Sequence, residues 1–136
     1  MYEQDYIMRE IKHAINMILR ILFKKRDTLN TLFLVEDNLN PLAENICKKI
    51  TKLCEKNNYS QAEDLLFCNA NQADMDVLKV GLYFYDLINN VDEEVLQKNN
   101  FSHDEIKNGL NDLLDIYDLH LPLFMTSYTD DDKTKF

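Results

Sequence analysis

The stretch VLKVGLYFYDLI, residues 77–88, is apolar on almost every side when it is wound as a helix. That pattern is typical of a helix buried at the centre of a domain. Asp74 stands at the N-cap position, which predicts a helix from about Met75 to Asn89. The whole chain holds only two glycines and two prolines, far fewer than a protein of β-hairpins needs. We therefore predict an all-α fold of about five helices in all, with this helix at its centre.

Start and stop signals for two further helices precede the central helix. The Asn-Pro pair at residues 40–41 offers an N-cap and a suitable first helical residue. That helix should end at the sequence KNN, residues 56–58, where asparagine can adopt a left-handed conformation. The next helix begins in YSQAEDLL, residues 59–66, because Ser60 and Glu63 have the spacing of a capping box.

After the central helix, the sequence predicts a short helical turn and one longer helix. The turn, EEVLQK, follows Asp92. The longer helix begins in FSHDEI, residues 101–106, with Ser102 as its N-cap, and extends to about Leu119. Short connections favour antiparallel packing of successive helices. We therefore expect residues 41–120 to form an antiparallel helical body.

The N-terminal segment predicts a long amphipathic helix over residues 6–24, with Asp5 as its N-cap. One stripe of this helix is basic and polar, and it gathers Arg9, Lys12, His13, Asn16, Arg20 and Lys24. The opposite side is apolar over more than half of the cylinder, and it includes Ile7, Ile11, Ile15, Ile18 and Leu22. A helix on a single core needs an apolar arc of only about 100°. We therefore expect something besides its own subunit to cover the excess.

The charge of the chain is unevenly distributed. The formal net charge is −9, which argues against general nucleic-acid binding by the whole surface. Residues 1–26 nevertheless carry six basic and three acidic side chains, a net charge of +3, and the remaining residues carry a net charge of −12. Such asymmetry between segments indicates an interaction surface.

Features of targeting are missing from the sequence. The start, MYEQDY, is acidic, and no signal-peptide pattern follows it. No stretch approaches the roughly 18 uncharged apolar residues of a membrane span. Cys47, Cys54 and Cys68 lie in helical patterns, where we expect reduced thiols that act as small apolar side chains. The sequence therefore predicts a soluble, cytoplasmic protein.

A single domain accounts for most of the chain. We predict one helical domain over residues 1–125, followed by a flexible acidic tail over residues 126–136. The linker at residues 27–40 contains TLFLV, which fits either a short extended segment or a helical turn.

The segment EKNNYSQAEDLL, residues 55–66, resembles the turn of a tetratricopeptide-type helical hairpin. In that hairpin an aromatic residue precedes a capped helix, and a small alanine lets the two helices approach. Tyr59 and Ala62 match these positions, and Leu66 falls on a typical large position. Ile50 stands where the family has a glycine, and no second copy occurs at a period of about 34 residues. The resemblance implies one tetratricopeptide-like hairpin within the body.

Three segments resemble an uncharacterised family of small bacterial helical proteins, catalogued as a domain of unknown function. They are YEQDYIMREIK (residues 2–12), QAEDLLF (residues 61–67) and FSHDEIKNGLNDL (residues 101–113). The resemblance implies an all-helical fold and a soluble bacterial protein. It carries no activity and no catalytic residues over to this chain.

No group of residues in the sequence predicts a reaction. Glu10 and His13 have the Glu-x-x-His spacing of carboxylate-bridged di-metal bundles, but those sites need two such pairs and two further glutamates. Residues 102–104, SHD, are neighbours on one helical turn and point in different directions. The acidic runs at residues 92–94 and 130–132 lack the alternating ligands and central glycine of a calcium loop. We predict no catalytic, cofactor-binding or metal-binding residues, and no enzymatic activity.

The N-terminal helix carries the leading hypothesis about function. It predicts a non-enzymatic interaction or scaffold module that binds another protein or self-associates, as a homodimer, through residues 6–24. The expected face combines apolar side chains that supply contact area with basic side chains that steer an acidic partner, or the acidic body of a second copy: Ile7, Ile11, Ile15, Ile18, Leu22, Arg9, Arg20, Lys24 and Lys25.

Two alternatives for this helix stay open. It can belong wholly to the core, with its cationic stripe facing water. It can also lie on an anionic membrane surface, as basic amphipathic helices do. Nucleic acid is not an expected partner, because the acidic body repels phosphate and the stripe lacks interleaved aromatic residues.

Overall fold

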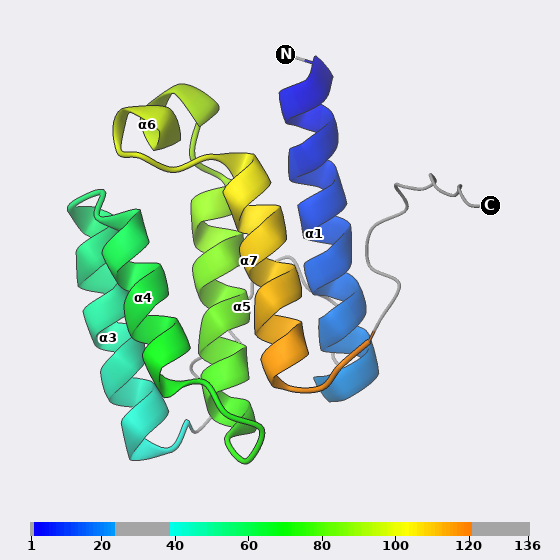
Figure 1. The fold of residues 1–136 in the computed structure, drawn as a ribbon, viewed down its shortest axis with the longest axis vertical. Coiled ribbons are helices and arrows are strands. Elements are labelled where there is room, and N and C mark those ends of the chain that lie inside the picture. The colour runs from blue at the N-terminus through cyan, green and yellow to red at the C-terminus, as the bar shows by residue number, and fades with distance from the viewer. Residues whose placement is uncertain (1, 24–38, 121–136) are drawn as a thin grey trace.

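A computed structural model describes residues 2–23 and 39–120 of the chain, and those residues form six α-helices and no strand. The prediction of an all-α fold is confirmed (Figure 1). Residues 27–38 of the predicted linker lie outside the described residues. Lys24, Lys25 and the predicted tail at 126–136 lie outside them too. The helices are α1 (Tyr2–Phe23), α3 (Pro41–Glu55), α4 (Tyr59–Asn69), α5 (Met75–Asn89), α6 (Glu93–Lys98) and α7 (His103–Ile116).

Helix α5 is the centre of the bundle. It contacts α1, α3, α4 and α7, and Figure 1 shows α3 and α4 on one side of it and α1 and α7 on the other. Eleven of its fifteen residues are buried, so the apolar stretch at residues 77–88 is covered almost all round, as its pattern predicts. Helices α3, α4, α5 and α7 alternate in direction, which confirms the antiparallel body.

Three of the predicted N-caps are confirmed by hydrogen bonds to the first turn of a helix. Asn40 Oδ1 accepts from the Ala43 N–H, and Asp74 Oδ1 accepts from the N–H groups of Asp76 and Val77. Ser102 Oγ accepts from the Glu105 N–H, at 3.1 Å. Each of these caps satisfies backbone donors that a helix leaves free at its start.

Two predicted caps are wrong. Helix α1 already includes Tyr2, so Asp5 lies within its first turns rather than before them. Helix α4 begins at Tyr59, so Ser60 lies inside it, and the true N-cap residue, Asn58, makes no capping bond through its side chain. The Glu63 carboxylate that a capping box would use instead accepts a hydrogen bond from Tyr85 on the neighbouring α5. A tertiary contact has replaced the local one.

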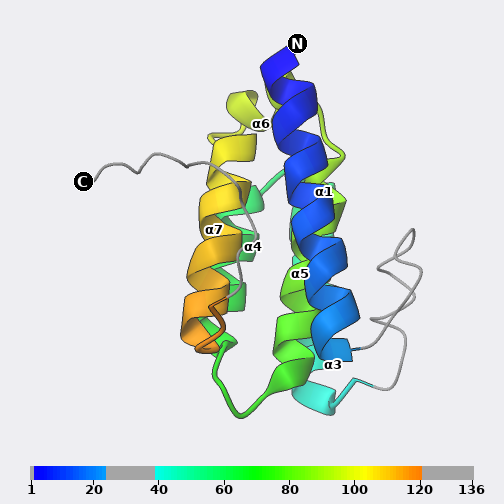
Figure 2. The same cartoon turned by 90° about the vertical axis from the view of Figure 1, so that its right-hand side faces the viewer.

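Helix α1 packs against both α5 and α7 (Figure 2). Ile11, Ile15 and Ile18 are completely buried in the core of this single chain, and Ile7 and Leu22 are half-buried. The prediction that Ile11, Ile15 and Ile18 belong to an interaction face is therefore wrong. A helix that packs between two neighbouring helices buries a wider arc of its own surface than a helix that lies on a flat core. Much of the wide apolar arc of α1 is therefore buried against α5 and α7.

Polar contacts also hold α1 to the body. Lys12 Nζ lies 2.8 Å from Asp86 Oδ1 of α5, and Lys107 Nζ of α7 lies 3.2 Å from Glu10 Oε1. Asn89 Nδ2 of α5 donates to the Met8 carbonyl oxygen, at 2.9 Å. Lys12 therefore turns from the predicted cationic stripe toward the acidic body.

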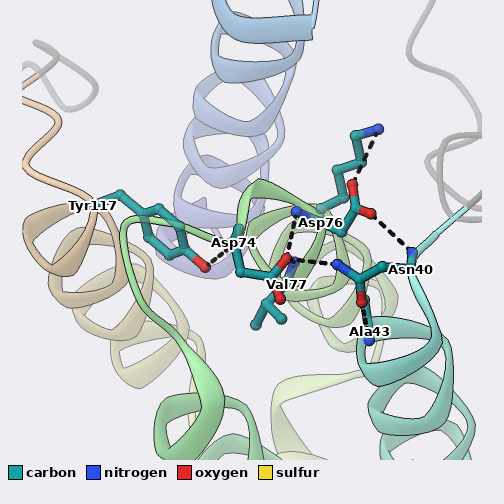
Figure 3. A network of polar contacts seen from close by, with 7 residues as sticks. Asn40, Ala43, Asp74, Asp76, Val77 and Tyr117 are labelled. Atoms are coloured by element: carbon teal, nitrogen blue, oxygen red, sulfur yellow. Dashed lines mark hydrogen bonds and ion pairs between the residues drawn. The ribbon is translucent and has the colours of Figure 1, made fainter.

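A polar network joins the ends of three helices (Figure 3). Asn40 Nδ2 donates to Asp74 Oδ1 at 2.9 Å, and the Asn40 N–H donates to Asp76 Oδ2 at 2.8 Å. From the other side, the Tyr117 hydroxyl donates to the Asp74 carbonyl oxygen at 2.8 Å. The start of α3, the start of α5 and the residue after α7 are thereby fixed to one another.

Helices α3 and α4 form a hairpin whose turn includes Asn57, with a φ of 60°. The KNN stop signal and its left-handed asparagine are thus confirmed. Tyr59, Ala62 and Leu66 are all buried in the hairpin, but its likeness to a tetratricopeptide unit stays a prediction.

The three cysteines differ in their surroundings. Cys54 is buried, Cys47 is half-buried and Cys68 is exposed, so the expectation of a small apolar role is wrong for Cys68. Burial raises the pKa of Cys54 to about 12 and also raises the pKa of Cys47. Both thiols stay protonated at neutral pH, as structural cysteines do.

Candidate functional site

The exposed side of α1 is the first candidate surface. Of the predicted face, Arg9 and Arg20 are exposed, while Lys24 and Lys25 lie outside the described residues. Tyr6 and Ile21, which were not part of the predicted face, are 60% and 52% exposed. We call the exposed side of this helix the outward face of α1, and its exposed residues are Asp5, Tyr6, Arg9, His13, Arg20 and Ile21.

The Glu10-x-x-His13 pair does not converge. Glu10 turns toward α7 and pairs with Lys107, whereas His13 is exposed on the outward face. No group of three or more histidine, cysteine, aspartate or glutamate side chains in residues 2–23 and 39–120 is arranged to hold a metal ion.

A cavity of about 360 Å³ lies between α4 and α7 and forms the second candidate surface. Four of its lining residues are carboxylates, which makes it strongly negative. We call it the acidic groove, and it is lined by Glu63, Asp64, Phe67, Glu105, Asn108, Gly109 and Asp112.

A partly buried hydrogen bond lies beside Gly109 of this groove. The Tyr85 hydroxyl donates to Glu63 Oε2 at 2.6 Å. A Cβ atom at Gly109 would collide with the Tyr85 hydroxyl and with Glu63 Oε2, so only glycine leaves room for this bond. Gly109 thus lets α7 approach this tyrosine–carboxylate pair closely.

The electrostatics of the groove are unfavourable for its own carboxylates. Burial raises the pKa of Glu63, and the nearby charges of Glu105, Asp64 and Asp112 raise it further, although the hydrogen bond from Tyr85 opposes the shift. The pKa of Tyr85 is also raised, by burial and by the negative charge of Glu63. A cation in the groove would relieve this repulsion. Carboxylates around a cavity suit an ammonium or guanidinium group.

Part of this groove was visible in the sequence as a pattern. Glu105, Asn108 and Asp112 follow one another at spacings of three and four, and such spacings place polar residues on one face of a helix. The sequence did not indicate that α4 lines the groove, because Glu63 also fits the pattern of a capping box. Nothing local indicates that Glu63 faces Tyr85.

A second cavity of about 360 Å³ lies between α3 and the C-terminal half of α5. Its lining is mixed, with Thr51, Cys54, Tyr59, Tyr83 and Leu87 among its residues. The Cys54 thiol is not activated there, because its pKa is raised rather than lowered.

Residues 102–104 do not act together. Ser102 caps α7, and Asp104 is exposed. His103 is 2% exposed, and its ring lies between Glu93 and the backbone of Asn89. The sequence did not indicate this buried contact, because Glu93 is ten residues away on another helix.

These features define the class of the molecule: a small all-α protein with an outer helix that exposes two arginines and with an acidic groove. The chain belongs to the family described as "Family of unknown function (DUF6483)", whose model matches residues 1–118. No curated protein and no solved structure matches the chain. Within the part of the chain that the structure describes, every helix is too short or too polar to cross a membrane.

Proposed function

We propose that the protein is a non-enzymatic protein–protein interaction module that self-associates, with the outward face of α1 of one copy seated on the acidic groove of another. The observation that carries the proposal is the separation of exposed charge. Arginines stand on α1, and four carboxylates line the cavity between α4 and α7. Patches of opposite sign on one molecule favour association of its copies.

The outward face of α1 has the composition of a contact surface. Tyr6 and Ile21 are among the most exposed large apolar side chains of the described residues, and Arg9 and Arg20 lie on the same side of the helix. Aromatic residues and arginine are enriched in protein interfaces, because they combine contact area with directed hydrogen bonds.

The acidic groove offers complementary chemistry. The planar guanidinium group of arginine binds carboxylates through paired hydrogen bonds, and Phe67 adds an aromatic surface on which it can stack. An arginine from a second copy would also neutralise the charges that raise the pKa of Glu63.

The positions of the two surfaces allow a closed dimer. Helix α7 lies between α4 and α1 in Figure 1, so the groove and the outward face lie on neighbouring sides of the molecule. Under two-fold symmetry each copy can place its α1 on the groove of the other, and both contacts close the assembly.

The molar mass in solution tests this proposal. We expect light scattering to give a dimer at tens of micromolar, with dissociation as salt is added, because surface ion pairs are screened. The double variant Arg9→Glu, Arg20→Glu should be monomeric. A variant that also carries Glu105→Arg and Asp112→Arg should recover the dimer, because both signs are then exchanged.

A matched control is available on α3. Lys49 and Lys52 are exposed and lie away from both surfaces, so Lys49→Glu with Lys52→Glu changes the net charge equally and should leave the dimer intact. A wild-type chain that stays monomeric at every concentration and at low salt contradicts the proposal.

The peripheral membrane hypothesis is a second candidate, and the pairing of Tyr6 and Ile21 with arginines on one helix face favours it. It predicts co-sedimentation with vesicles of anionic phospholipid at low salt, lost in the Arg9→Glu, Arg20→Glu variant. Vesicle binding by a chain that is monomeric in solution would favour the membrane over the dimer.

A further inference from the structure

The ring of His103 lies between two hydrogen-bond acceptors. Its Nδ1 is 2.6 Å from Glu93 Oε1, and its Nε2 is 3.1 Å from the Asn89 carbonyl oxygen. A neutral imidazole has a single N–H, so it can donate to one of these oxygens but not to both. In either neutral tautomer, a nitrogen lone pair would face an oxygen lone pair inside the protein. The doubly protonated ring satisfies both contacts.

The surroundings of Glu93 fit a negative carboxylate beside that ring. Glu93 Oε1 also accepts from the His103 backbone N–H at 3.0 Å, and Gln97 Nε2 donates to Glu93 Oε2 at 2.7 Å. Burial opposes ionisation, but these hydrogen bonds and the His103 ring outweigh it and lower the pKa of Glu93.

The same residues tie four helices together at one end of the bundle. Glu93 is the first residue of α6, His103 the first of α7 and Asn89 the last of α5, and Asn89 Nδ2 reaches the Met8 carbonyl of α1. Helix α6 has six residues, too few to be stable by itself. Besides Glu93, the completely buried side chain of Leu96 anchors it.

We propose that His103 holds α6 on the bundle through a proton-dependent contact, in which the doubly protonated ring binds Glu93 and the Asn89 carbonyl, and loss of one ring proton releases α6. The proposal goes beyond self-association, because neither the outward face of α1 nor the acidic groove contains these residues. Release of α6 would uncover Leu96 and Phe101, which is 2% exposed and packs its ring against Tyr59.

The groups that face the ring come from each neighbouring element. Glu93 comes from α6, and the Asn89 carbonyl comes from α5. On α7 itself, Lys107 pairs with Glu10 of α1, and Asp104 and Glu105 are exposed to solvent. The partner that responds to the ring proton is therefore Glu93.

The sign of the pH dependence follows from proton linkage. Opening separates the ring from both acceptors and so from the contacts that favour its second proton, which makes opening easier as the pH rises. The protection of α6 amides against hydrogen exchange should then fall by up to about tenfold per pH unit relative to α5 amides, which serve as the internal reference.

Two measurements on the full wild-type chain test this. Nitrogen NMR should find both ring nitrogens of His103 protonated at neutral pH in the folded protein. Hydrogen exchange at Leu96 and Phe101, whose N–H groups donate to the Asp92 and Leu96 carbonyl oxygens, should show the predicted fall. A neutral His103 ring with a single N–H, or α6 protection that follows α5 at every pH, would overturn the proposal.

Variants separate the proton from the packing. His103→Gln and Glu93→Gln should each remove the pH dependence of α6 protection, whereas His120→Gln should leave it unchanged because His120 is exposed and bonds only Asp118 among the described residues. Wild-type pH dependence in His103→Gln contradicts the proposal. If either variant fails to fold, the two wild-type measurements still decide the question.

Discussion

At the scale of single residues, Gly109 and Gly81 are both places where a side chain would meet another helix, but the neighbours differ. At Gly109 the added Cβ would collide with the Tyr85 hydroxyl, which stands on a rigid ring held by Glu63. At Gly81 the nearest atom is Leu113 Cδ2, at 2.5 Å, the end of a side chain that can rotate. The rigidity of the neighbour decides the cost of each contact.

We expect Gly109→Ala to lower the free energy of unfolding by about 1–3 kcal/mol, because overpacking outweighs the helix propensity that alanine gains. Gly81→Ala should cost less, since Leu113 can move. Urea denaturation of both variants measures the difference. An equal loss of stability in the two variants would contradict this explanation, because it would mean that Tyr85 and Glu63 move aside as easily as the Leu113 side chain.

Glu63 predicts a pH-dependent effect of its own. Its pKa is raised in the folded chain, so folding favours the protonated carboxyl group over the ionised one. The stability that the protonated group contributes is fully present at acid pH and is lost as the pH rises through the folded pKa. Glu63→Gln keeps an acceptor for Tyr85 and removes the charge. We expect this variant to be more stable than wild type at neutral pH and equal to it at acid pH, as measured by urea denaturation across pH. A loss of stability at neutral pH would contradict this cause.

At the scale of the helices, the attachment of α1 combines a buried isoleucine stripe with ion pairs to α5 and α7. The amphipathic pattern predicts a long N-terminal helix that packs on the helical body, and this prediction is confirmed. The pattern cannot say which basic residues turn inward, because the periodicity of one helix does not contain the positions of the carboxylates on another. Lys12 turned inward, and Arg9 and Arg20 did not.

The pair of Lys12 and Asp86 predicts a cost when it is broken. We expect Lys12→Met to destabilise the protein by about 1–3 kcal/mol, less than a fully buried pair because the Lys12 side chain is partly exposed. The double variant Lys12→Met, Asp86→Leu should recover part of this loss. Lys48→Met is the control: Lys48 and Glu44 form an exposed pair 3.9 Å apart, and its loss should change stability by less than about 0.5 kcal/mol. A double-mutant cycle with no coupling energy would show that α1 is held by the isoleucines alone.

At the scale of the whole molecule, α5 joins α1, α3, α4 and α7 around one core. It contacts the hairpin of α3 and α4 on one side and α1 and α7 on the other. Because the isoleucine stripe of α1 is part of the same core, α1 is a structural element of the domain as well as the carrier of the outward face.

We therefore expect a chain that lacks residues 1–23 to lose cooperative unfolding, because its removal uncovers the apolar sides of α5 and α7. Thermal circular dichroism and the binding of a dye for exposed apolar surface measure this. A chain that lacks the tail predicted from the sequence at residues 126–136 is the control, and that prediction implies unfolding at the wild-type temperature. A sharp unfolding transition without residues 1–23 would show that α1 is only an appended helix.

The sequence by itself determined the features that depend on neighbours along the chain. The caps at Asn40, Asp74 and Ser102 and the span of the central helix follow from hydrogen bonds and periodicities within a few residues. The all-α class follows from the same local patterns.

Tertiary structure alone decided the contacts between distant residues. Glu63 and Tyr85 are 22 residues apart, Lys12 and Asp86 are 74 apart, and Glu10 and Lys107 are 97 apart. Tertiary structure also decided how much of the wide apolar arc of α1 is buried, because that depends on how α5 and α7 pack against it. A helix pattern states which side of a helix is apolar, whereas the shape of its neighbours determines how much of that side water can reach.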